Sequence, residues 1–367
     1  MKKKYALTIL PAAAVAAAVL AQGPLAPPGA PVPAMKTLDQ IEPRTPISNL
    51  PVTVSQSGSY YLTGNLQFTA PSGHAITIAA DEVTLDLMGF KLSSSNIVTG
   101  DAIHINGGHR NITVKNGAIA GNSTVTISGT APNRAWTVSP AGFNRGVTAA
   151  PTPEAKDCLF SGLHISRCRL DGLFGGEQAI AEKVTATENG GSGINLSFGG
   201  NLTGCTTRLN GDHGIEAGYC LLANCVATYN GGPGGIAASY GAVTNCLASF
   251  NRAYGISAFY ASVANSIASH NDGTGIGAGT VCNCHAYSNG SDGISSSNGG
   301  SITNSIAISN EGTGILSSFS GSITHCMARF NGDDGISAPS GVIAFSGAAS
   351  NNKNDNGSTL TRSSYVA

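Results

Sequence analysis

A motif repeated along the second half of the chain decides the fold of this protein. Residues 205–215 read CTTRLNGDHGI, and residues 225–236 read CVATYNGGPGGI. In both, a cysteine stands five positions before an asparagine, a small residue stands three positions before it, and a Gly-Ile pair follows it. The asparagine recurs with a period close to 20 residues, at Asn189, Asn210, Asn230, Asn251, Asn271, Asn289, Asn310, Asn331 and Asn351. A period this regular is typical of a solenoid, in which each repeat adds one coil.

The offsets within the repeat indicate which solenoid it is. Positions five and three before the asparagine differ by two, so their side chains point to one face of a strand. A further apolar residue stands eight positions before the asparagine, three residues before the cysteine position. Because a step of three breaks the alternation of a strand, a sharp turn must lie between these two positions. The residue before the cysteine is often asparagine, as at Asn224 and Asn245, and asparagine tolerates the left-handed backbone of such a turn. Three short strands in about 20 residues predict an all-β fold, a single-stranded parallel β-helix. Neither leucine ladders nor amphipathic helices are present to support another solenoid.

The composition excludes several other classes of protein. Charged residues make up 11% of the 367 residues, whereas an average soluble domain contains about 25%. A helix bundle or coiled coil needs more Glu, Lys and Arg than this on its exposed faces. A hydrophobic content of 41% with a net charge of -1 argues against disorder. Because 19 basic residues are balanced by 20 acidic ones, we expect no nucleic-acid partner.

The N-terminus predicts export. Three lysines at residues 2–4 precede an apolar run that ends in small residues at Ala21. This is the order of a secretory signal peptide, which we expect at residues 1–21 with cleavage near Ala21. The run contains Pro11 and is shorter than the roughly 20 apolar residues of a membrane span. We therefore expect a periplasmic, cell-surface or secreted monomer without a membrane span, preceded by a Pro-rich linker at residues 22–36.

The first half of the chain resembles a known family. Residues 75–78 (AITI) and 83–90 (VTLDLMGF), and then residues 111–117 (NITVKNG), are similar to the opening coils of pectin-lyase-like right-handed β-helix proteins. Residues 58–62 (GSYYL) resemble part of the N-terminal cap of exported bacterial members. The resemblance implies a right-handed coil. It does not imply one activity, because the superfamily includes lyases, hydrolases, epimerases and non-catalytic proteins.

These observations divide the chain into segments. We expect an N-terminal cap at residues 37–74, because solenoid ends need covering, and the β-helix at residues 75–351. Residues 122–157 lose the period and contain four prolines, which predicts a loop excursion. Residues 352–367 form a polar C-terminal tail.

The repeat also explains most of the nine cysteines. An exported chain with many cysteines would suggest disulfides. Here most of them occupy the inward position that serine fills in other coils, which predicts free buried thiols. Strands about 4.8 Å apart do not forbid a bridge, and Cys158 and Cys168 lie outside the repeat.

The turn between the asparagine and the Gly-Ile pair carries acidic residues. They are Asp212, Asp272, Asp292, Glu311, Asp333 and Asp334. Three interpretations are open. Asp is a common turn residue; Asp272, Asp292 and Glu311 could bind Ca²⁺ as oxygen ligands from neighbouring coils; or Asp292, Glu311, Asp333 and Asp334 could supply the paired carboxylates of a glycosidase.

No family motif completes a catalytic site. A polygalacturonase-like site needs an Asp-Asp pair followed by Gly-His-Gly and Arg-Ile-Lys segments. Here Asp333-Asp334 is the only such pair, and Asp212-His213-Gly214 precedes it. The Asp-Pro-His motif of mannuronan epimerases is absent. Any enzymatic activity would therefore be that of a polysaccharide lyase or glycoside hydrolase with an unrecognised site.

Candidate substrate-binding residues come from three places. Aromatic residues stand four positions after the Gly-Ile isoleucine, at Tyr219, Tyr240 and Tyr260, and such a row could either stack on sugars or, by strand alternation, pack in the core. Trp136 lies in the 122–157 excursion, and long loops on a rigid scaffold often carry function. Arg329 is an outward basic candidate.

The sequence thus predicts an exported β-helix protein that binds or processes an extended polysaccharide along a lateral groove, with uronic-acid polymers among the candidates. The alternative is a non-catalytic structural or cell-surface protein. The first prediction depends mainly on the resemblance, and the missing catalytic motif favours the second.

Overall fold

The computed structural model describes residues 43–196, 199–297 and 299–352. The predicted signal peptide, linker and nearly all of the polar tail lie outside these residues. The described chain is all-β and forms a parallel β-solenoid of about 14 turns with about 21 residues per turn, as predicted. None of the described residues belongs to a helix with the length and hydrophobicity of a membrane span.

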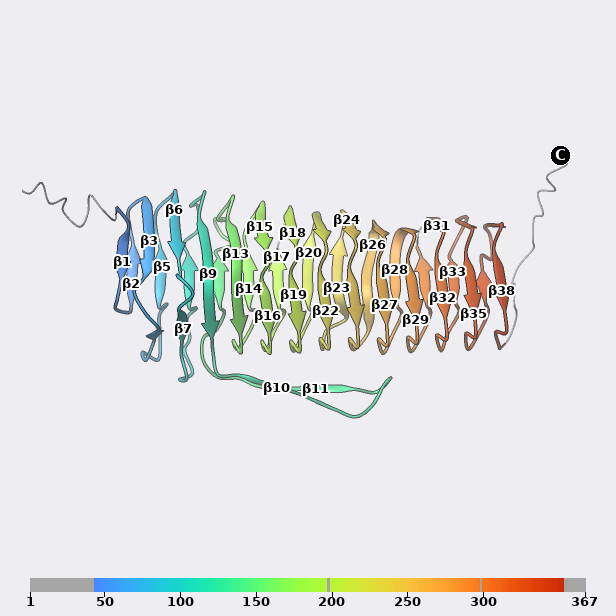
Figure 1. The fold of residues 1–367 in the computed structure, drawn as a ribbon, viewed down its shortest axis with the longest axis horizontal. Helices are drawn as coiled ribbons and strands as arrows, with labels where there is room; N and C mark the ends of the chain where they lie inside the picture. Colours follow the sequence, from blue (N-terminus) through green and yellow to red (C-terminus); the bar gives the residue numbers. More distant parts are fainter. Residues whose placement is uncertain (1–42, 197–198, 298, 353–367) are drawn as a thin grey trace, which may run out of the picture. The chain divides into compact units, whose positions relative to one another are not determined.

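Each regular coil contributes one strand to each of three parallel sheets (Figure 1). Sheet 1 contains β2 (Val52–Val54), β5 (Ile76–Ile78), β8 (Ile103–Ile105), β12 (Val147–Ala149), β14 (Leu173–Gly175), β17 (Ile194–Leu196), β20 (Ile215–Gly218), β23 (Gly234–Ser239), β26 (Tyr254–Ala264), β28 (Ile276–Cys282), β30 (Ile294–Ser296), β33 (Ile315–Ser317) and β36 (Ile336–Ser337). Strands β26 and β28 continue into sheet 2.

Sheet 2 contains those two strands together with β1 (Thr45–Ile47), β3 (Gly58–Leu62), β6 (Val83–Asp86), β9 (Thr113–Ala120), β13 (Leu159–Ser166), β15 (Ala179–Glu182), β18 (Gly200–Thr203), β21 (Cys220–Ala223), β24 (Ala242–Thr244), β31 (Ser301–Thr303), β34 (Ser322–Thr324) and β37 (Val342–Ala344). Strands β9 and β13 continue into sheet 3.

Sheet 3 adds β4 (Leu66–Gln67), β7 (Lys91–Ser93), β16 (Thr185–Thr187), β19 (Thr206–Arg208), β22 (Val226–Thr228), β25 (Leu247–Ser249), β27 (Ile267–Ser269), β29 (His285–Tyr287), β32 (Ile306–Ile308), β35 (Met327–Arg329) and β38 (Gly347–Ala349). Within the region predicted as a cap, β2, β3 and β4 already pair in parallel with β5, β6 and β7. Coil-like pairing therefore begins before Ala75, and capping by residues 37–74 stays a prediction.

The core is a stack of identical positions from successive coils. Ile194 pairs with Ile215, which pairs with Ile236, and all three are fully buried. The residues three positions before the asparagines are buried in the same way, as Ala227 and Ala248 are. Because each inward residue packs on its equivalent in the next coil, small and β-branched residues of constant size fill the interior without voids.

At least two residues in each regular coil adopt the left-handed backbone. One is the residue before the inward cysteine or serine, where Asn224 and Asn245 have φ of 56° and 54°, as predicted. The other directly precedes the repeated asparagine, where Tyr229 and Phe250 have φ of 57° and 58°. The left-handed conformation costs roughly 1–2 kcal/mol for each of these bulky residues. Their side chains point outward.

The repeated asparagines form a buried hydrogen-bonded ladder. Asn251 is fully buried. Its Oδ1 accepts the backbone N–H of Asn230 at 3.0 Å and the Nδ2 of Asn230 at 3.1 Å. Its Nδ2 donates to the carbonyl of Ala227 at 3.1 Å and to Oδ1 of Asn271 at 3.0 Å. Every polar atom of the side chain thus has a partner, which is what allows an amide row inside the turn.

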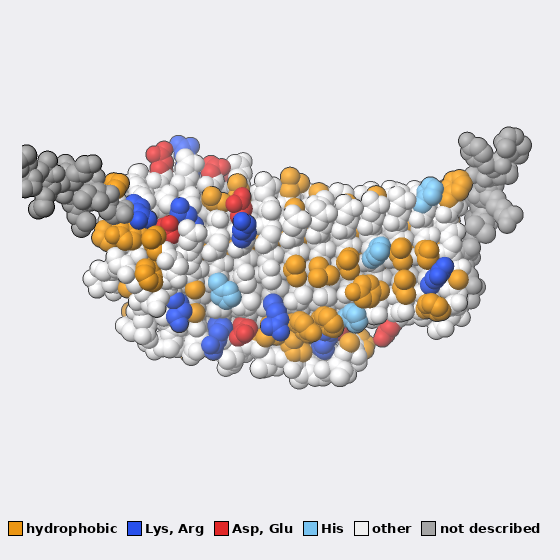
Figure 2. Space-filling view, in the orientation of Figure 1, with side chains coloured by type: hydrophobic (Ala, Val, Ile, Leu, Met, Phe, Trp, Pro, Cys, Tyr) orange, Lys and Arg blue, Asp and Glu red, His pale blue; other side chains and the backbone are white. Residues whose placement is uncertain are grey.

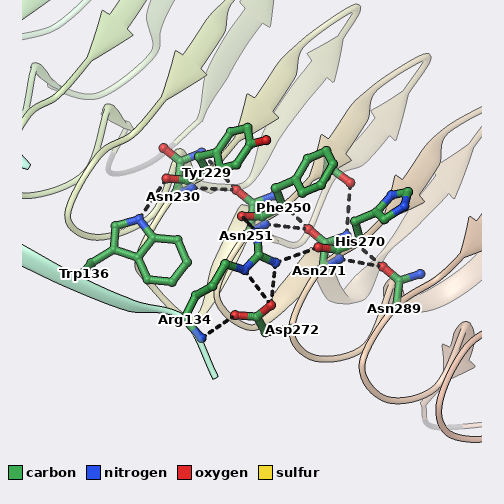
Figure 3. A network of polar contacts seen from close by, with 11 residues as sticks. Arg134, Trp136, Tyr229, Asn230, Phe250, Asn251, His270, Asn271, Asp272 and Asn289 are labelled. Carbon is green, nitrogen blue, oxygen red and sulfur yellow. Dashed lines mark hydrogen bonds and ion pairs between the residues drawn. The ribbon is translucent and has the colours of Figure 1, made fainter. Parts of the chain in front are cut away.

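The predicted excursion contains an antiparallel hairpin, β10 (Thr124–Ser128) and β11 (Ala135–Ser139). Figure 1 shows it running beside the later coils. Its residue Arg134 donates from Nε to Oδ1 of Asp272 at 2.8 Å, and from Nη1 and Nη2 to the carbonyls of Phe250 and His270 at 3.1 and 2.7 Å (Figure 3). The side chains of Arg134 and Asp272 are only 7% and 1% exposed. A buried ion pair, reinforced by hydrogen bonds to two backbone carbonyls, therefore holds the hairpin on the coils.

The outward side of sheet 3 carries apolar side chains at two register positions over the later coils. Exposed hydrophobic residues here include Ile267, Tyr287, Ile308 and Met327. Figure 2 shows hydrophobic side chains gathered over these coils, above the hairpin. Charged side chains are sparse on this surface, in keeping with the low charge of the sequence.

All nine cysteines are free, and eight are buried, which confirms the prediction of free thiols. Burial raises the pKa of Cys158 to about 12 and the pKa values of Cys220 and Cys284 to about 11. We expect a thiol reagent such as DTNB to label Cys282, the one half-buried thiol, in the native protein, and all nine after denaturation without reductant. Fewer than nine titratable thiols in the denatured, unreduced protein would reveal a disulfide and contradict this prediction.

Candidate functional site

The outward side of sheet 1 carries most of the polar chemistry of the N-terminal half. In most three-residue strands of this sheet the middle residue is more exposed than its two buried neighbours, as in the Ile103-His104-Ile105 segment of β8. A second row of side chains comes from the turn before each strand, two positions before the first residue of that strand, and lies along the same edge of the sheet. The outward residues of consecutive coils are Thr77, His104, Thr148, Phe174, Asn195 and Glu216. The turn residues of the same coils are His74, Asp101, Arg145, Asp171, Ser192 and His213.

A pocket of about 440 Å³ opens on this face over β17, β20 and β23. Polar groups from two coils meet in it, because Nδ2 of Asn195 donates to Oε2 of Glu216 at 2.8 Å. His213, Tyr219 and Tyr240 complete the lining. The pocket combines a carboxylate, an amide, an imidazole and two aromatic rings, which is a set that can orient a polar ligand with an apolar face.

The imidazole of His213 is held beside two carboxylates. Its Nδ1 lies 3.1 Å from Oδ1 of Asp212, is buried, and makes no well-aligned hydrogen bond. Burial acts to lower the pKa of His213, but Asp212 and then Glu216 outweigh burial and place that pKa above its usual value. The contact with His213 in turn lowers the pKa of Asp212, although burial opposes it. The neighbouring carboxylates therefore favour the protonated form of this imidazole.

The predicted tyrosine row lies on the surface at the end of these strands. Tyr219 stacks on Tyr240 with ring centroids 4.8 Å apart, and Tyr240 stacks on Tyr260 at 5.0 Å. The rings are 57%, 43% and 61% exposed, respectively. The interpretation of this row as a core stack is therefore wrong. Tyr219 and Tyr240 have φ of 54° and 57°, and this left-handed turn reverses the side-chain direction that simple alternation predicts.

The stack limits how a ligand can contact the tyrosines. The two faces of the Tyr240 ring are covered by Tyr219 and Tyr260, which explains why Tyr240 is the least exposed of the three. Its edge and hydroxyl group remain available. The row therefore offers a strip of ring edges and hydroxyls, rather than a set of separate platforms.

Arg145 and Asp171 extend the polar band toward the N-terminal coils. Nε of Arg145 donates to Oδ2 of Asp171 at 2.9 Å, and the guanidinium lies 4.6 Å above the ring of Phe174. Asp171 also accepts the backbone N–H of Ser192 at 2.9 Å. These contacts hold both charges in place along the edge of sheet 1.

Three further residues form a cluster on the two coils before Arg145. Nδ1 of His104 lies 2.9 Å from Oδ2 of Asp101, and Nδ1 of His74 lies 3.6 Å from the same oxygen. Burial opposes ionisation of Asp101, but the contact with His104 and the nearby Thr148 hydroxyl dominate together and lower the pKa of Asp101. Burial and then His104 lower the pKa of His74. Sequence reasoning missed this cluster because its members lie in coils of irregular length, where the period does not align them.

The predicted acidic row is not gathered into one site. Asp272 is bound by Arg134. Asp292 accepts the N–H of Thr313 at 2.8 Å, Glu311 is exposed, and Asp333 and Asp334 are half-buried. Burial raises the pKa of Asp292 despite that N–H, and the charge of Asp333 adds to the effect. A raised pKa suits a general acid, but catalysis and Ca²⁺ binding by these carboxylates both stay predictions.

The two other predicted binding residues lie apart from the pocket. Nε1 of Trp136 donates to the carbonyl of Tyr229 at 2.9 Å. A Cβ at Gly231 would approach Cγ of Trp136 to 2.6 Å, so the ring packs directly on the backbone of a coil. Arg329 is exposed on sheet 3 and lines a cavity of about 660 Å³ with His325 and Phe345. Ligand binding by Trp136 and Arg329 stays a prediction.

Comparison with solved structures agrees with this architecture. The A-module of the Azotobacter vinelandii mannuronan C-5 epimerase AlgE6 superposes with a TM-score of 0.51 at 16% identity, covering 83% of this chain and 90% of that one. The chain has the pectin-lyase-like parallel β-helix fold. This β-helix is also similar to the A. vinelandii AlgE4 A-module, with a TM-score of 0.42 at 11% identity, covering 83% of this chain and 90% of that one. A GH87 α-1,3-glucanase catalytic unit from Streptomyces thermodiastaticus has a TM-score of 0.44 at 12% identity. The match covers 84% of this chain and 64% of that one.

At these identities the similarity concerns the fold of the β-helix alone. The sequence matches no protein-family model and no curated protein. What the candidate site does therefore depends on the geometry of its own residues.

Proposed function

We propose that this β-helix binds an extended polysaccharide along the outward side of sheet 1. The observation that carries the proposal is the pocket in which Asn195, His213 and Glu216 meet the exposed rings of Tyr219 and Tyr240. Sugar rings present hydroxyl groups at their edges and apolar C–H faces. Amide, carboxylate and imidazole groups can form hydrogen bonds with the hydroxyl groups, and the edges of tyrosine rings can pack against the apolar C–H faces.

The geometry of the coils favours a polymer over a small ligand. Neighbouring strands lie about 4.8 Å apart, so a chain lying along the stack meets equivalent positions at each coil. Polar and aromatic groups continue beyond the pocket in both directions, through Phe174 and Arg145 on one side and Tyr260 on the other. The polysaccharide-acting proteins of similar fold are consistent with this proposal, which depends on the pocket and not on them.

The charges of the pocket favour a neutral polysaccharide. Its lining contains Glu216 and no Lys or Arg, and Asp212 lies beside His213. A uronic-acid polymer would bring further carboxylates next to these two, at an electrostatic cost that His213 only partly offsets. We therefore expect neutral glycans to bind more tightly than polyuronates such as alginate.

Replacing Tyr240 by asparagine is expected to weaken binding of the best glycan about tenfold. Asparagine tolerates the left-handed backbone of this position, so the change removes the ring without straining the turn. Loss of an aromatic contact of about 1.4 kcal/mol corresponds to this factor. Isothermal titration with a glycan chosen from an array measures the effect.

The matched control is Phe319→Asn. Phe319 has the same place in a later coil, a φ of 62° and an exposure of 69%, but it lies outside the pocket. An equal loss of affinity in both variants would contradict the proposed site. Absence of binding to every neutral and acidic glycan on the array would contradict the proposed function and favour a structural role for the β-helix.

A further inference from the structure

The cluster of His74, Asp101 and His104 has the composition and spacing of an incomplete metal-binding shell. It is the one group of three His, Cys, Asp or Glu side chains in the described ranges whose ligand atoms all lie within 4.8 Å of one another. In a tetrahedral site with bonds of about 2.1 Å, ligand atoms lie roughly 3.4 Å apart. Nδ1 of His104 lies 2.9 Å from Oδ2 of Asp101. All three ligand atoms lie within 4.8 Å of one another, so small side-chain shifts would bring them to this spacing.

The carboxylate of Asp101 is already aimed at the two imidazoles. Its Oδ1 accepts the backbone N–H of Arg145 at 3.1 Å, which leaves Oδ2 facing His104 and His74. The Asp101 side chain is only 6% exposed, whereas His74 and His104 are 31% and 21% exposed. Such fixing of a ligand by an outer hydrogen bond is usual around protein metal sites, and the exposed histidines leave a path for an ion.

The two imidazole rings lie against each other, with centroids 3.9 Å apart and planes 17° apart. Because the nitrogen lone pairs lie in the ring planes, those of the two histidines lie in nearly parallel planes. An ion bridging the two histidines would therefore tilt the rings apart, which their partial exposure allows. Nδ1 of His74 accepts the N–H of Asp101 at 3.0 Å, so His74 would use its Nε2.

We propose that His74, Asp101 and His104 bind one divalent transition-metal ion of the zinc type. Two imidazoles and one carboxylate are the three-ligand set that zinc accepts with a fourth position open. Calcium needs six to eight oxygen ligands, and this cluster offers a single carboxylate. The site lies on the same side of sheet 1 as the glycan pocket but does not depend on the proposed function.

The test is titration of ZnCl₂ into the full chain without an affinity tag, after dialysis against a chelator. We expect one ion per chain by calorimetry and elemental analysis. His104→Ala and Asp101→Asn should each weaken binding by more than the roughly 10- to 100-fold typical of losing an outer-shell partner. His74→Ala should do the same. It leaves the 2.9 Å contact between His104 and Asp101 in place and removes the acceptor of the Asp101 N–H.

The matched control is His109→Ala. His109 forms a similar pair with Asp81, with Nδ1 2.9 Å from Oδ1, but no third ligand joins it from the part of the chain that the structure describes. This variant should bind zinc like the parent protein. Absence of stoichiometric zinc binding, unchanged binding in His74→Ala, or equal loss in His109→Ala would each overturn the proposal, as would a preference for CaCl₂ over ZnCl₂. Zinc should also raise the melting temperature of the parent and leave that of His104→Ala unchanged.

Discussion

Replacing Asn251 by alanine is expected to lower the free energy of unfolding by at least about 3 kcal/mol. The change removes four hydrogen bonds from a fully buried position. It leaves the N–H and side-chain amide of Asn230 and the carbonyl of Ala227 without these partners. Each buried polar group that loses its partner costs about 1–3 kcal/mol, and the alanine leaves a cavity as well. Chemical denaturation followed by circular dichroism measures the change.

The control for the asparagine ladder is Asn201→Ala. Asn201 is exposed and lies in β18, where it pairs with strands through its backbone only. Its replacement should alter stability by less than about 0.5 kcal/mol. Similar effects of the two substitutions would show that the ladder contributes little beyond the backbone pairing of the coils.

Replacing Arg134 by methionine is expected to cost about 3–5 kcal/mol and to release the hairpin from the coils. Methionine keeps most of the side-chain volume but removes the charge. The carboxylate of Asp272, 1% exposed, would then be buried without a cation, and the carbonyls of Phe250 and His270 would lose their donors. Breaking one side of a buried ion pair typically costs this much. Thermal unfolding and limited proteolysis between β10 and β11 report the two effects.

A second substitution separates charge from packing. Adding Asp272→Asn to Arg134→Met removes the uncompensated charge, so part of the lost stability should return. Arg329→Met, at an exposed position, should change neither melting temperature nor cleavage. If Arg134→Met leaves the hairpin resistant to protease, then Trp136 and the strand contacts hold it without the ion pair.

Much of the fold could be predicted because the repeat is local. The step between positions such as Cys225 and Ala227 identifies an inward strand face, and the left-handed turn at Asn224 follows from residue type alone. These rules repeat in each coil and need no knowledge of distant residues. The period of the asparagines and the inward positions of the cysteines and alanines were accordingly predicted correctly.

The candidate site was harder to predict because its residues depend on how coils align. The spacing of the repeat identifies Tyr219 and Tyr240, but their exposure follows from a left-handed turn at each of them. Bulky aromatic residues rarely adopt this backbone conformation, so the residue type does not predict the turn. His74 and Asp101 are 27 residues apart, and the irregular lengths of these early coils hide their alignment. Arg134 and Asp272 meet across 138 residues, and no periodic signal connects the excursion with the coils that it covers.

The sequence by itself determined that this protein is a parallel β-helix, which residues face inward, and that its thiols are small core residues. The reason is that one coil stacks on the next, so a period and a two-residue offset specify the interior. Only the tertiary structure decided where the hairpin docks, which tyrosines reach the surface, and that two histidines and an aspartate converge. Those contacts join residues outside the repeat, and their distances depend on the lengths of all the coils between them.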